Sequence, residues 1–305
     1  MRRWGSGPTA LRLTWLLMRA TASVSMHLTR RPVARLWFTV WRGASGQTAE
    51  EREHTWLAGT QPLKVPFEGR QIAGFVAGAG PTVLLVHGWG DRAVRLGAFI
   101  RPLVDSGFRV VGVDLPAHGE SPGRRTDVFE LARAVRAVAD EVGAAFVVAH
   151  SLGGTATVRA LGDGLNVRAV ALVAPAVRLD HVLHRFESMF RLPPRAVLAL
   201  RIEIHRRFGG RVWTALASDR TAAVLHIPAL IVHDEADPQI ALSDAHLLAA
   251  AWPGARLVTT EGLGHQRIVR DERVVREIVG FIVATEARVA AWDESRGLPP
   301  VLRHA

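Results

Sequence analysis

The chain has 305 residues, of which 49% are hydrophobic and 22% are charged, and its formal net charge is +10. This length predicts one large domain or two ordinary domains, with enough chain to bury a core. Because the sequence contains no cysteine and no tyrosine, it excludes a disulfide framework, thiolate metal ligands, a cysteine nucleophile and any phenolic acid or base.

The positive charge is concentrated in two regions of the chain. No acidic residue precedes Glu50, and the arginines before it give this stretch a charge of +8. Residues 177–220 carry a further net charge of +5, so the rest of the chain is slightly negative. Neither region contains a zinc-finger, RNP or heptad pattern. We therefore expect no binding of nucleic acid.

Two short amphipathic helices are predicted near the N-terminus. Residues 10–28 place leucine, tryptophan and methionine on one helical stripe and arginines on another, and the pattern repeats after Pro32. The arginines interrupt each apolar run well short of the ~18–20 residues of a membrane span. A signal peptide is disfavoured by Arg12 inside the apolar run and by Arg19 beside the small-residue site.

These basic helices have two interpretations. They could lie on an anionic membrane surface, or they could pack their apolar stripe on the domain that follows. We favour packing, because both helices are short and tryptophans also suit a core. We expect residues 1–60 to form this extension, residues 61–292 the main domain and residues 293–305 a tail. The expected location is the cytoplasm, with peripheral contact at the inner face of a membrane as the alternative.

The central part of the chain alternates apolar runs with helical patterns, after a predicted hairpin with a glycine turn at residues 65–72. The runs are continuous, which is typical of strands covered on both faces. They are Val83–Val86, Val110–Val113, Phe146–Val148, Val170–Val173, Leu230–Val232 and Leu257–Val258. Helices are predicted over Ala93–Val104, over Val128–Val142 and along a stripe from Val274 to Ile282. This alternation predicts an α/β fold with a parallel sheet.

One interval departs from the alternation. Residues 177–225 separate two predicted strands by far more than a usual crossover. The interval has a helical pattern with a break at Pro193-Pro194. We interpret it as a short helical lid inserted into the α/β domain.

Ser151 lies where a predicted strand runs directly into a helical pattern, in the pentapeptide Ala149-His-Ser-Leu-Gly153. A serine nucleophile needs exposure on a sharp turn, and the residues two positions before and after it must be small. Ala149 and Gly153 meet this requirement. The alternative is a glycine-rich connection in which the serine is buried or caps the helix.

Four further segments follow strands along the chain. They are His87-Gly-Trp-Gly90, Asp114-Leu-Pro-Ala-His-Gly-Glu-Ser121, His233-Asp-Glu-Ala-Asp237 and Gly262-Leu-Gly-His265. Together with the serine pentapeptide, they resemble the motifs of the α/β-hydrolase family over roughly residues 65–285. The resemblance implies that family's fold, a mostly parallel sheet flanked by helices. The chain departs from the family pattern at Ala149 and Ala117, where glycine is usual.

The resemblance also implies a catalytic triad in the chain order Ser151, Asp237, His265. The serine hydroxyl would be the nucleophile, the imidazole its general base, and the carboxylate would orient the imidazole. Asp234 is a rival for the carboxylate. Its position directly after the strand suits a turn better than the triad, so we favour Asp237.

Other groups are expected around the triad. The backbone amides of Trp89 and Leu152 would form an oxyanion hole. The residues expected to support the two neighbouring loops are His87, Gly88, Asp114 and His118. The histidines of the predicted lid lack an acidic or cysteine partner at ligand spacing, and the sequence has no dinucleotide fingerprint. We expect no metal and no cofactor.

The expected function is that of a serine hydrolase, carboxylesterase-like or lipase-like, acting on a small or medium acyl substrate through an acyl-enzyme. A thioesterase, an acyltransferase and a carbon–carbon hydrolase on the same scaffold are alternatives, because a fold does not determine the substrate. A membrane-attached binding or scaffold protein with an idle triad is an alternative of a different class. The sequence does not predict the oligomeric state.

Overall fold

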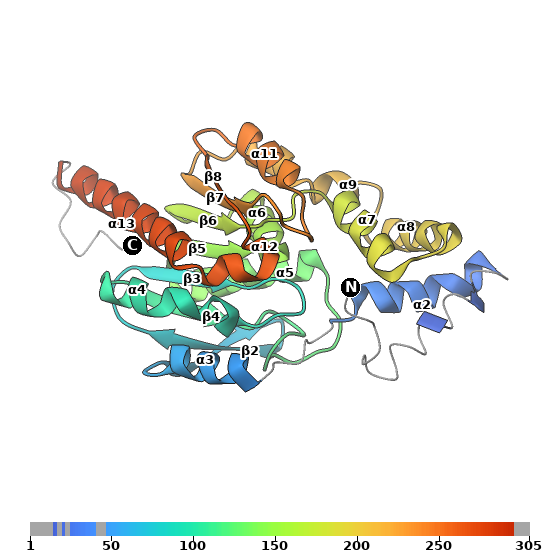
Figure 1. Cartoon of the computed structure of the whole chain (residues 1–305), viewed down its shortest axis with the longest axis horizontal. Coiled ribbons are helices and arrows are strands. Elements are labelled where there is room, and N and C mark those ends of the chain that lie inside the picture. The colour runs from blue at the N-terminus through green and yellow to red at the C-terminus, as the bar shows by residue number, and fades with distance from the viewer. Residues whose placement is uncertain (1–14, 17–19, 22–24, 41–46, 296–305) are drawn as a thin grey trace. The chain divides into compact units, whose positions relative to one another are not determined.

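The computed structural model describes residues 15–16, 20–21, 25–40 and 47–295 (Figure 1). Most of the first predicted helix, the signal-peptide alternative and the end of the predicted tail lie outside the described residues. The described chain separates into two units. The larger unit comprises residues from Val40 to Val177 and from Ser218 onward, and the smaller unit comprises residues up to Thr39 together with Arg178–Ala217.

An eight-stranded sheet with the order β1-β2-β4-β3-β5-β6-β7-β8 forms the centre of the larger unit. The strands are β1 (Gln61–Phe67), β2 (Arg70–Ala77), β3 (Thr82–Val86), β4 (Arg109–Val113), β5 (Ala144–His150), β6 (Ala169–Val173), β7 (Ala229–Asp234) and β8 (Arg256–Thr260). Strand β2 pairs antiparallel with β1 and with β4, and the other neighbours are parallel. Each apolar run predicted as a strand lies within one of the strands β3–β8.

The predicted hairpin is confirmed, because Phe67 of β1 faces Arg70 of β2 across a two-residue turn. Both turn residues have positive φ, 43° at Glu68 and 73° at Gly69. Two positive φ angles match the twist of the flanking strands. The turn therefore fixes the register of the antiparallel edge of the sheet.

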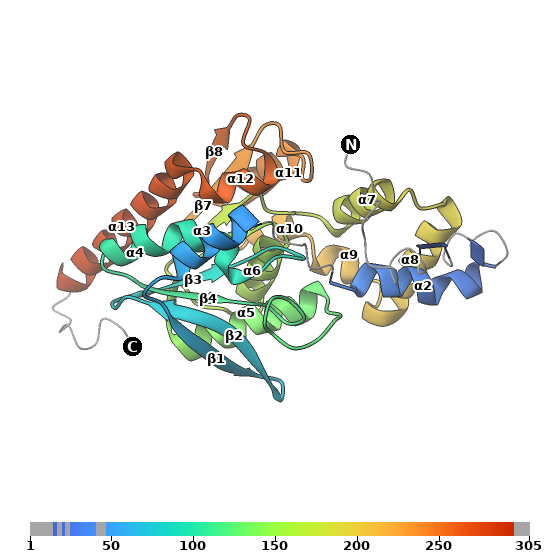
Figure 2. The same cartoon turned by 60° about the horizontal axis from the view of Figure 1, so that its bottom comes forward.

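Helices cover both faces of the sheet (Figure 2). Along β3, Leu84 and Val86 belong to the apolar core on one face, whereas Val83 and Leu85 belong to the core on the other. The first core is closed by α5 (Val128–Val142), α6 (Leu152–Gly162) and α11 (Leu242–Ala251). The second is closed by η1 (Ala93–Phe99), α4 (Ile100–Asp105) and α13 (Glu272–Ser295), with α3 (Gln47–Leu57) beside η1. Two buried faces explain why the strands are apolar along their whole length.

Helix α5 has the predicted bounds because both of its ends are encoded locally. The Asp127 side chain accepts hydrogen bonds from the amides of Phe129 and Glu130, and Gly143 ends the helix at φ 62°. These are the usual cap and stop signals. The helix predicted over Ala93–Val104 is instead the 3₁₀ segment η1 followed by α4, with non-helical backbone at Leu96.

The smaller unit is helical. Its elements are α2 (Met26–Phe38), α7 (Leu179–Phe190), α8 (Pro194–Phe208) and α9 (Val212–Ala215), and α2 packs against α8. The chain breaks between α7 and α8, where Pro193 and Pro194 were expected to interrupt the helical pattern. No described helix has the length and apolar character needed to cross a bilayer.

The interval predicted as a lid leaves and rejoins the larger unit at one place. The amide of Ser218 donates a hydrogen bond to the carbonyl of Val177 at 2.8 Å. The amide of Val177 itself donates to Asp244 Oδ2 at 3.1 Å. Beyond Ser218 the chain forms α10 (Ser218–Ala222), and before α13 it forms α12 (Gly264–Arg267) and η2 (Ile268–Arg270).

We expect Ala117→Gly to stabilise the protein, because Ala117 adopts φ 69°. A residue with a Cβ is strained at this φ by roughly 1–2 kcal/mol, and glycine relieves that strain. Glycine also makes the unfolded chain more flexible, which offsets about 0.5–1 kcal/mol of the stabilisation. The free energy of unfolding in urea should rise by about 0.5–1 kcal/mol. The matched change Ala284→Gly, on the exposed face of α13, should lower it by about 1 kcal/mol. Equal effects of the two changes would contradict the strain at Ala117.

Candidate active site

Ser151 occupies a sharp turn between the end of β5 and the start of α6. Its backbone has φ 54° and ψ −125°, which only a few non-glycine residues adopt. The turn is held from both sides, since the Ser151 amide donates to the Val173 carbonyl at 3.0 Å and the Ser151 carbonyl accepts from Gly154 at 2.9 Å. The serine hydroxyl is thereby presented at the carboxyl end of the sheet.

The small residues around Ser151 are required by close approach of the backbone. A Cβ placed on Gly153 would lie 2.3 Å from the carbonyl oxygen of His87 and 2.9 Å from that of Val86. No real Cβ tolerates such distances, so α6 can begin this close to β3 only with glycine at this position. Ala149, on the strand side of the turn, is fully buried.

The imidazole of His265 bridges Ser151 and Asp237. Its Nε2 lies 3.0 Å from Ser151 Oγ, and its Nδ1 lies 2.7 Å from Asp237 Oδ2. The imidazole and the carboxylate are both almost completely buried. The carboxylate accepts the Nδ1 proton, so the lone pair of Nε2 faces the hydroxyl. The three side chains predicted as a triad therefore form one continuous hydrogen-bonded chain.

Asp237 is fixed by more than the histidine. Its Oδ1 accepts hydrogen bonds from the amides of Gln239 at 2.7 Å and Ile240 at 3.0 Å. Burial alone would raise the pKa of this carboxyl, but the hydrogen bond and charge of His265 and the two amides together lower the pKa below its usual value. The group is a carboxylate at neutral pH.

Asp234, the rival carboxylate, has other partners. Its Oδ2 accepts from Thr260 Oγ1 at 2.8 Å and from the amide of Leu263 at 2.9 Å, and its Oδ1 accepts from the amide of Ala236. These bonds join the end of β7 to the segment that leads into His265. Asp234 therefore positions the histidine segment, whereas Asp237 contacts the imidazole.

His87 shapes the loop in front of the serine. Its Nδ1 donates to the carbonyl of Gly88 at 2.7 Å, and its Nε2 accepts from the amide of Leu115 at 2.9 Å. A ring that donates with one nitrogen and accepts with the other is neutral. Burial lowers its pKa, and the charge of Asp114 opposes that shift only in part. A Cβ on Gly88 would lie 3.0 Å from Ser151 Cβ, so this loop directly adjoins Ser151.

The amides expected to form an oxyanion hole belong to Trp89, on this loop, and to Leu152, at the first position of α6. Neither amide has a hydrogen-bond acceptor among the described residues. Helix N-termini and glycine-rich turns carry amides that are free to receive a developing negative charge.

Asp114 ties together the loops after β3 and β4. Its carboxylate accepts from the amide of Ala93 at 2.7 Å and from that of Glu120 at 2.8 Å. A Cβ on Gly119 would overlap the carboxylate at 1.9 Å. His118, in the same loop, lies edge-on to Trp89 with ring centroids 5.5 Å apart. His118 also lies 4.9 Å from His87 between ring centroids, so these residues join the two loops, of which the one carrying Gly88 adjoins Ser151.

Sequence reasoning missed the part that His150 plays. Its Nε2 donates to the backbone carbonyl of His265 at 3.0 Å, and the two rings lie 4.7 Å apart between centroids. Burial is the main cause that holds the pKa of His150 well below its usual range, and the electrostatic influence of His265 adds to it. Only the position before the nucleophile could have indicated this contact, because 115 residues separate the two histidines.

A second missed group fixes the residue after His265. Arg95 donates to Gln266 Oε1 at 2.8 Å and pairs with Asp91 at 3.1 Å. No spacing in the sequence links these residues. Among the residues that the structure describes, no cluster of three histidine or carboxylate side chains is arranged to hold a metal ion.

Comparison with known proteins gives a family match over most of the larger unit. Residues 83–278 match the model of the alpha/beta hydrolase family. An esterase from Exiguobacterium antarcticum superposes with a TM-score of 0.59 at 19% identity, over 73% of this chain and 99% of the esterase. At this identity the likeness concerns the fold.

Two curated relatives are similar over shorter stretches. The dihydrolipoyllysine-residue acetyltransferase component of the acetoin cleaving system of Cupriavidus necator is 39% identical over 103 residues, covering 32% of this chain and 27% of that protein. The pimeloyl-[acyl-carrier protein] methyl ester esterase of Xanthomonas campestris is 38% identical over 106 residues, covering 34% of this chain and 40% of the esterase. The chain thus spans well under half the length of these relatives.

We expect acid to destabilise the protein from about pH 6.5 downward. Three buried histidines, His87, His150 and His233, have a lowered pKa in the folded protein, chiefly because of burial. As pH falls through the unfolded-state pKa of about 6.5, the unfolded chain binds protons that the folded chain does not. The contribution of these histidines to the free energy of unfolding is therefore fully present above that pH. Below it, the free energy of unfolding decreases by up to about 1.4 kcal/mol per pH unit for each histidine.

Urea unfolding at pH 7.5, 6.5 and 5.5 would measure this slope. His150→Gln should reduce the slope by up to about 1.4 kcal/mol per pH unit. His246→Gln, at an exposed position of α11, should leave the slope unchanged. An unfolding free energy that is independent of pH over this range would contradict the neutral buried state of these rings.

Proposed function

This chain belongs to the alpha/beta hydrolase family, and we propose that it is a serine hydrolase that cleaves an ester-like acyl bond through an acyl-enzyme. One observation carries the proposal: the His265 imidazole accepts at 3.0 Å from Ser151 and is held at 2.7 Å by a buried carboxylate. This arrangement activates a hydroxyl that is a weak nucleophile on its own.

In the first step, Ser151 Oγ attacks the acyl carbon while His265 Nε2 takes the hydroxyl proton. The carbonyl electron pair moves onto oxygen, giving a tetrahedral intermediate. When the intermediate collapses, the bond to the leaving alkoxide breaks, and the imidazolium returns the proton to that oxygen. Water then attacks the acyl-enzyme by the same route, so the acid is released and the serine is restored.

Asp237 orients the base in this scheme. Its carboxylate fixes the Nδ1–H tautomer of His265 and stabilises the imidazolium that forms in each step. The lowered pKa of Asp237 supports this role, because the carboxylate stays ionised while the imidazole gains and loses its proton.

The amides of Trp89 and Leu152 are the proposed donors to the oxyanion. Trp89 follows Gly88, which lies against Ser151, and Leu152 follows Ser151 directly in the chain. Losing one such donor costs about 10²–10³ in rate in comparable sites. Because the donors are backbone groups, the positive φ at Ser151 and the glycine at 88 set their direction.

An ester is the favoured substrate class. The relative from Xanthomonas is by name an esterase acting on a methyl ester, and the structural neighbour from Exiguobacterium is an esterase. The relative from Cupriavidus is by name an acetyltransferase component, which supports acyl transfer to another acceptor as the second candidate. Both reactions share the acyl-enzyme and differ in whether water or another nucleophile resolves it.

Labelling with a fluorophosphonate probe tests nucleophile activation without a known substrate. We expect the wild-type chain to be labelled, and we expect Ser151→Ala to fold normally and remain unlabelled. A panel of p-nitrophenyl esters of increasing acyl length should then be hydrolysed, and product analysis with an added alcohol would reveal transfer. Labelling that persists in Ser151→Ala, or a folded wild type that resists the probe, would favour an idle triad.

The two carboxylates should respond differently to removal of their charge. Asp237→Asn should lower kcat by about 10⁴-fold, as loss of the orienting carboxylate does in other serine triads. Asp234→Asn should act mainly on stability, because its carboxylate holds backbone and threonine groups. Activity per folded molecule and urea unfolding would separate the effects. If Asp234→Asn lowered kcat more than Asp237→Asn, the assignment would be reversed.

A further inference from the structure

The positive charge of the protein resides in the smaller unit. Its described residues carry eleven arginines and only three carboxylates. Residues 40–177 and 218–305 together hold 23 basic and 25 acidic residues. The smaller unit is therefore strongly cationic, whereas the rest of the chain is slightly acidic.

The carboxylates of the smaller unit are already paired within it. Glu203 accepts from Arg206 at 2.7 and 3.1 Å and lies 3.7 Å from Arg30. The other pairs are Arg178–Asp180 at 3.5 Å and His184–Glu187 at 3.6 Å. Six exposed arginines have no carboxylate partner among the described residues, namely Arg31, Arg35, Arg191, Arg195, Arg201 and Arg211. These cations are available to an external anion.

An exposed leucine lies beside two of these cations on α2. Leu28 is 56% exposed, and Arg31 and Arg35 follow it one and two turns later on the same face. The opposite face, with Val33 and Leu36, is buried. Leu28 is thus exposed to solvent beside two arginines, on the face of α2 that does not pack against the protein.

Helix α8 repeats this pattern. Arg195, Leu198, Arg201 and His205 follow one another at spacings of three or four residues and are all exposed, with Leu198 at 50%. Of the large hydrophobic side chains that are exposed among the described residues, five belong to the smaller unit: Leu16, Met26, Leu28, Met189 and Leu198. Mixed leucine and arginine on an outer helix face is typical of helices that lie in a membrane interface.

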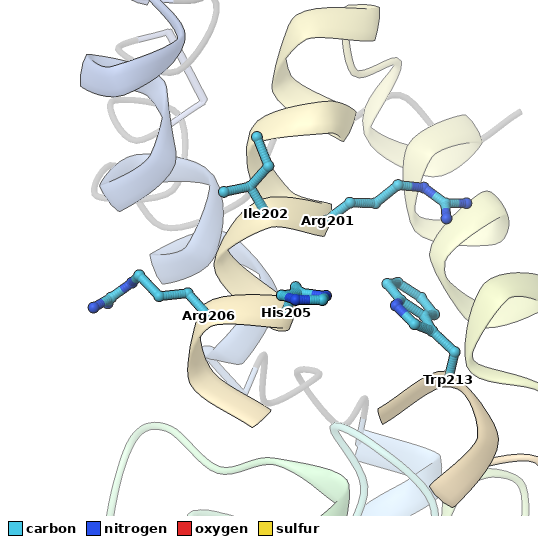
Figure 3. Close-up of a pocket in the computed structure, with 5 residues that line it drawn as sticks. All are labelled: Arg201, Ile202, His205, Arg206 and Trp213. Atoms are coloured by element: carbon cyan, nitrogen blue, oxygen red, sulfur yellow. The ribbon is translucent and has the colours of Figure 1, made fainter. Parts of the chain in front are cut away.

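An open hollow of about 490 Å³ adjoins the outer face of α8. It is lined by Arg201, Ile202, His205 and Arg206 of α8 and by Trp213 of α9 (Figure 3). The guanidinium of Arg201 lies over the Trp213 ring, 5.1 Å from its centroid. Tryptophan and arginine together suit the headgroup level of a bilayer, where one partner contacts acyl carbon and the other phosphate.

We propose that the smaller helical unit docks on the surface of a membrane rich in anionic lipids, using the outer faces of α2 and α8 and the hollow at Trp213. The arginines bind lipid phosphates, and Leu28 and Leu198 enter the boundary between headgroups and acyl chains. Charge alone would suit any polyanion, including an acidic protein. The exposed leucines favour lipid over a purely ionic polyanion, because they gain free energy where an apolar layer beneath the anionic surface receives them.

Sedimentation with sucrose-loaded vesicles tests the electrostatic part, using phosphatidylcholine with and without 30% phosphatidylglycerol. The full chain should bind the anionic vesicles and bind neutral ones at least tenfold more weakly. Arg195→Gln with Arg201→Gln should weaken anionic binding about 25-fold, since each arginine near such a surface contributes about fivefold. Arg101→Gln with Arg276→Gln removes the same charge from exposed positions of the larger unit and should change binding less than twofold.

The apolar part is tested by Leu28→Ser with Leu198→Ser, which should weaken vesicle binding at least tenfold, including at 0.5 M salt. If only the arginine changes matter and salt abolishes binding, the surface recognises polyanions such as an acidic protein, and the membrane proposal is wrong. It is equally wrong if neutral vesicles bind as well as anionic ones, or if the α8 variants bind like the wild type. Ser151→Ala should bind vesicles normally, so a failure of the proposed hydrolase activity leaves this result unaffected.

Discussion

The structure depends on how closely α6 approaches the strand beside it. The helix can begin directly after Ser151 only because position 153 has no Cβ to collide with the carbonyls of Val86 and His87. Ser151, at the turn between the end of β5 and the helix, has the unusual φ of 54°. The loop carrying Gly88 also lies against Ser151. The absence of a side chain at position 153 therefore permits the close packing of α6 against β3 that this turn requires.

Hydrogen bonds between side chains and backbone distribute this constraint over the carboxyl edge of the sheet. Asp114 joins two loops, Asp234 joins the end of β7 to the segment leading into His265, and His150 joins β5 to the backbone of His265. Asp114, Asp234 and His150 are buried, so the partners of the two carboxylates and of His150 Nε2 offset the free energy that unpaired groups would cost there. The site is thus held by groups that do not themselves touch the reacting atoms.

Much of this arrangement could be predicted from the sequence, because its causes are local. Continuous apolar runs predicted the strands, and the small residues flanking Ser151 predicted its turn. The capping groups of α5 fixed that helix to the residue. Prediction failed over Ala93–Val104, where Asp114 receives the amide of Ala93 and a 3₁₀ segment replaces the expected helix. The contacts of His150 with His265 and of Arg95 with Gln266 were also missed, since no pattern links residues more than a hundred positions apart.

The junction at Val177 and Ser218 has a consequence for how this chain could vary. The segment inserted between these residues begins and ends at positions joined by one hydrogen bond. Its two ends therefore lie side by side, whatever the length of the chain between them. The entropy of closing such an excursion grows only with the logarithm of its length. Segments of very different size could therefore be exchanged at this point without disturbing β6, β7 or Ser151 at the end of β5. The residues around Ser151 and the segment between Val177 and Ser218 could thus change independently of each other.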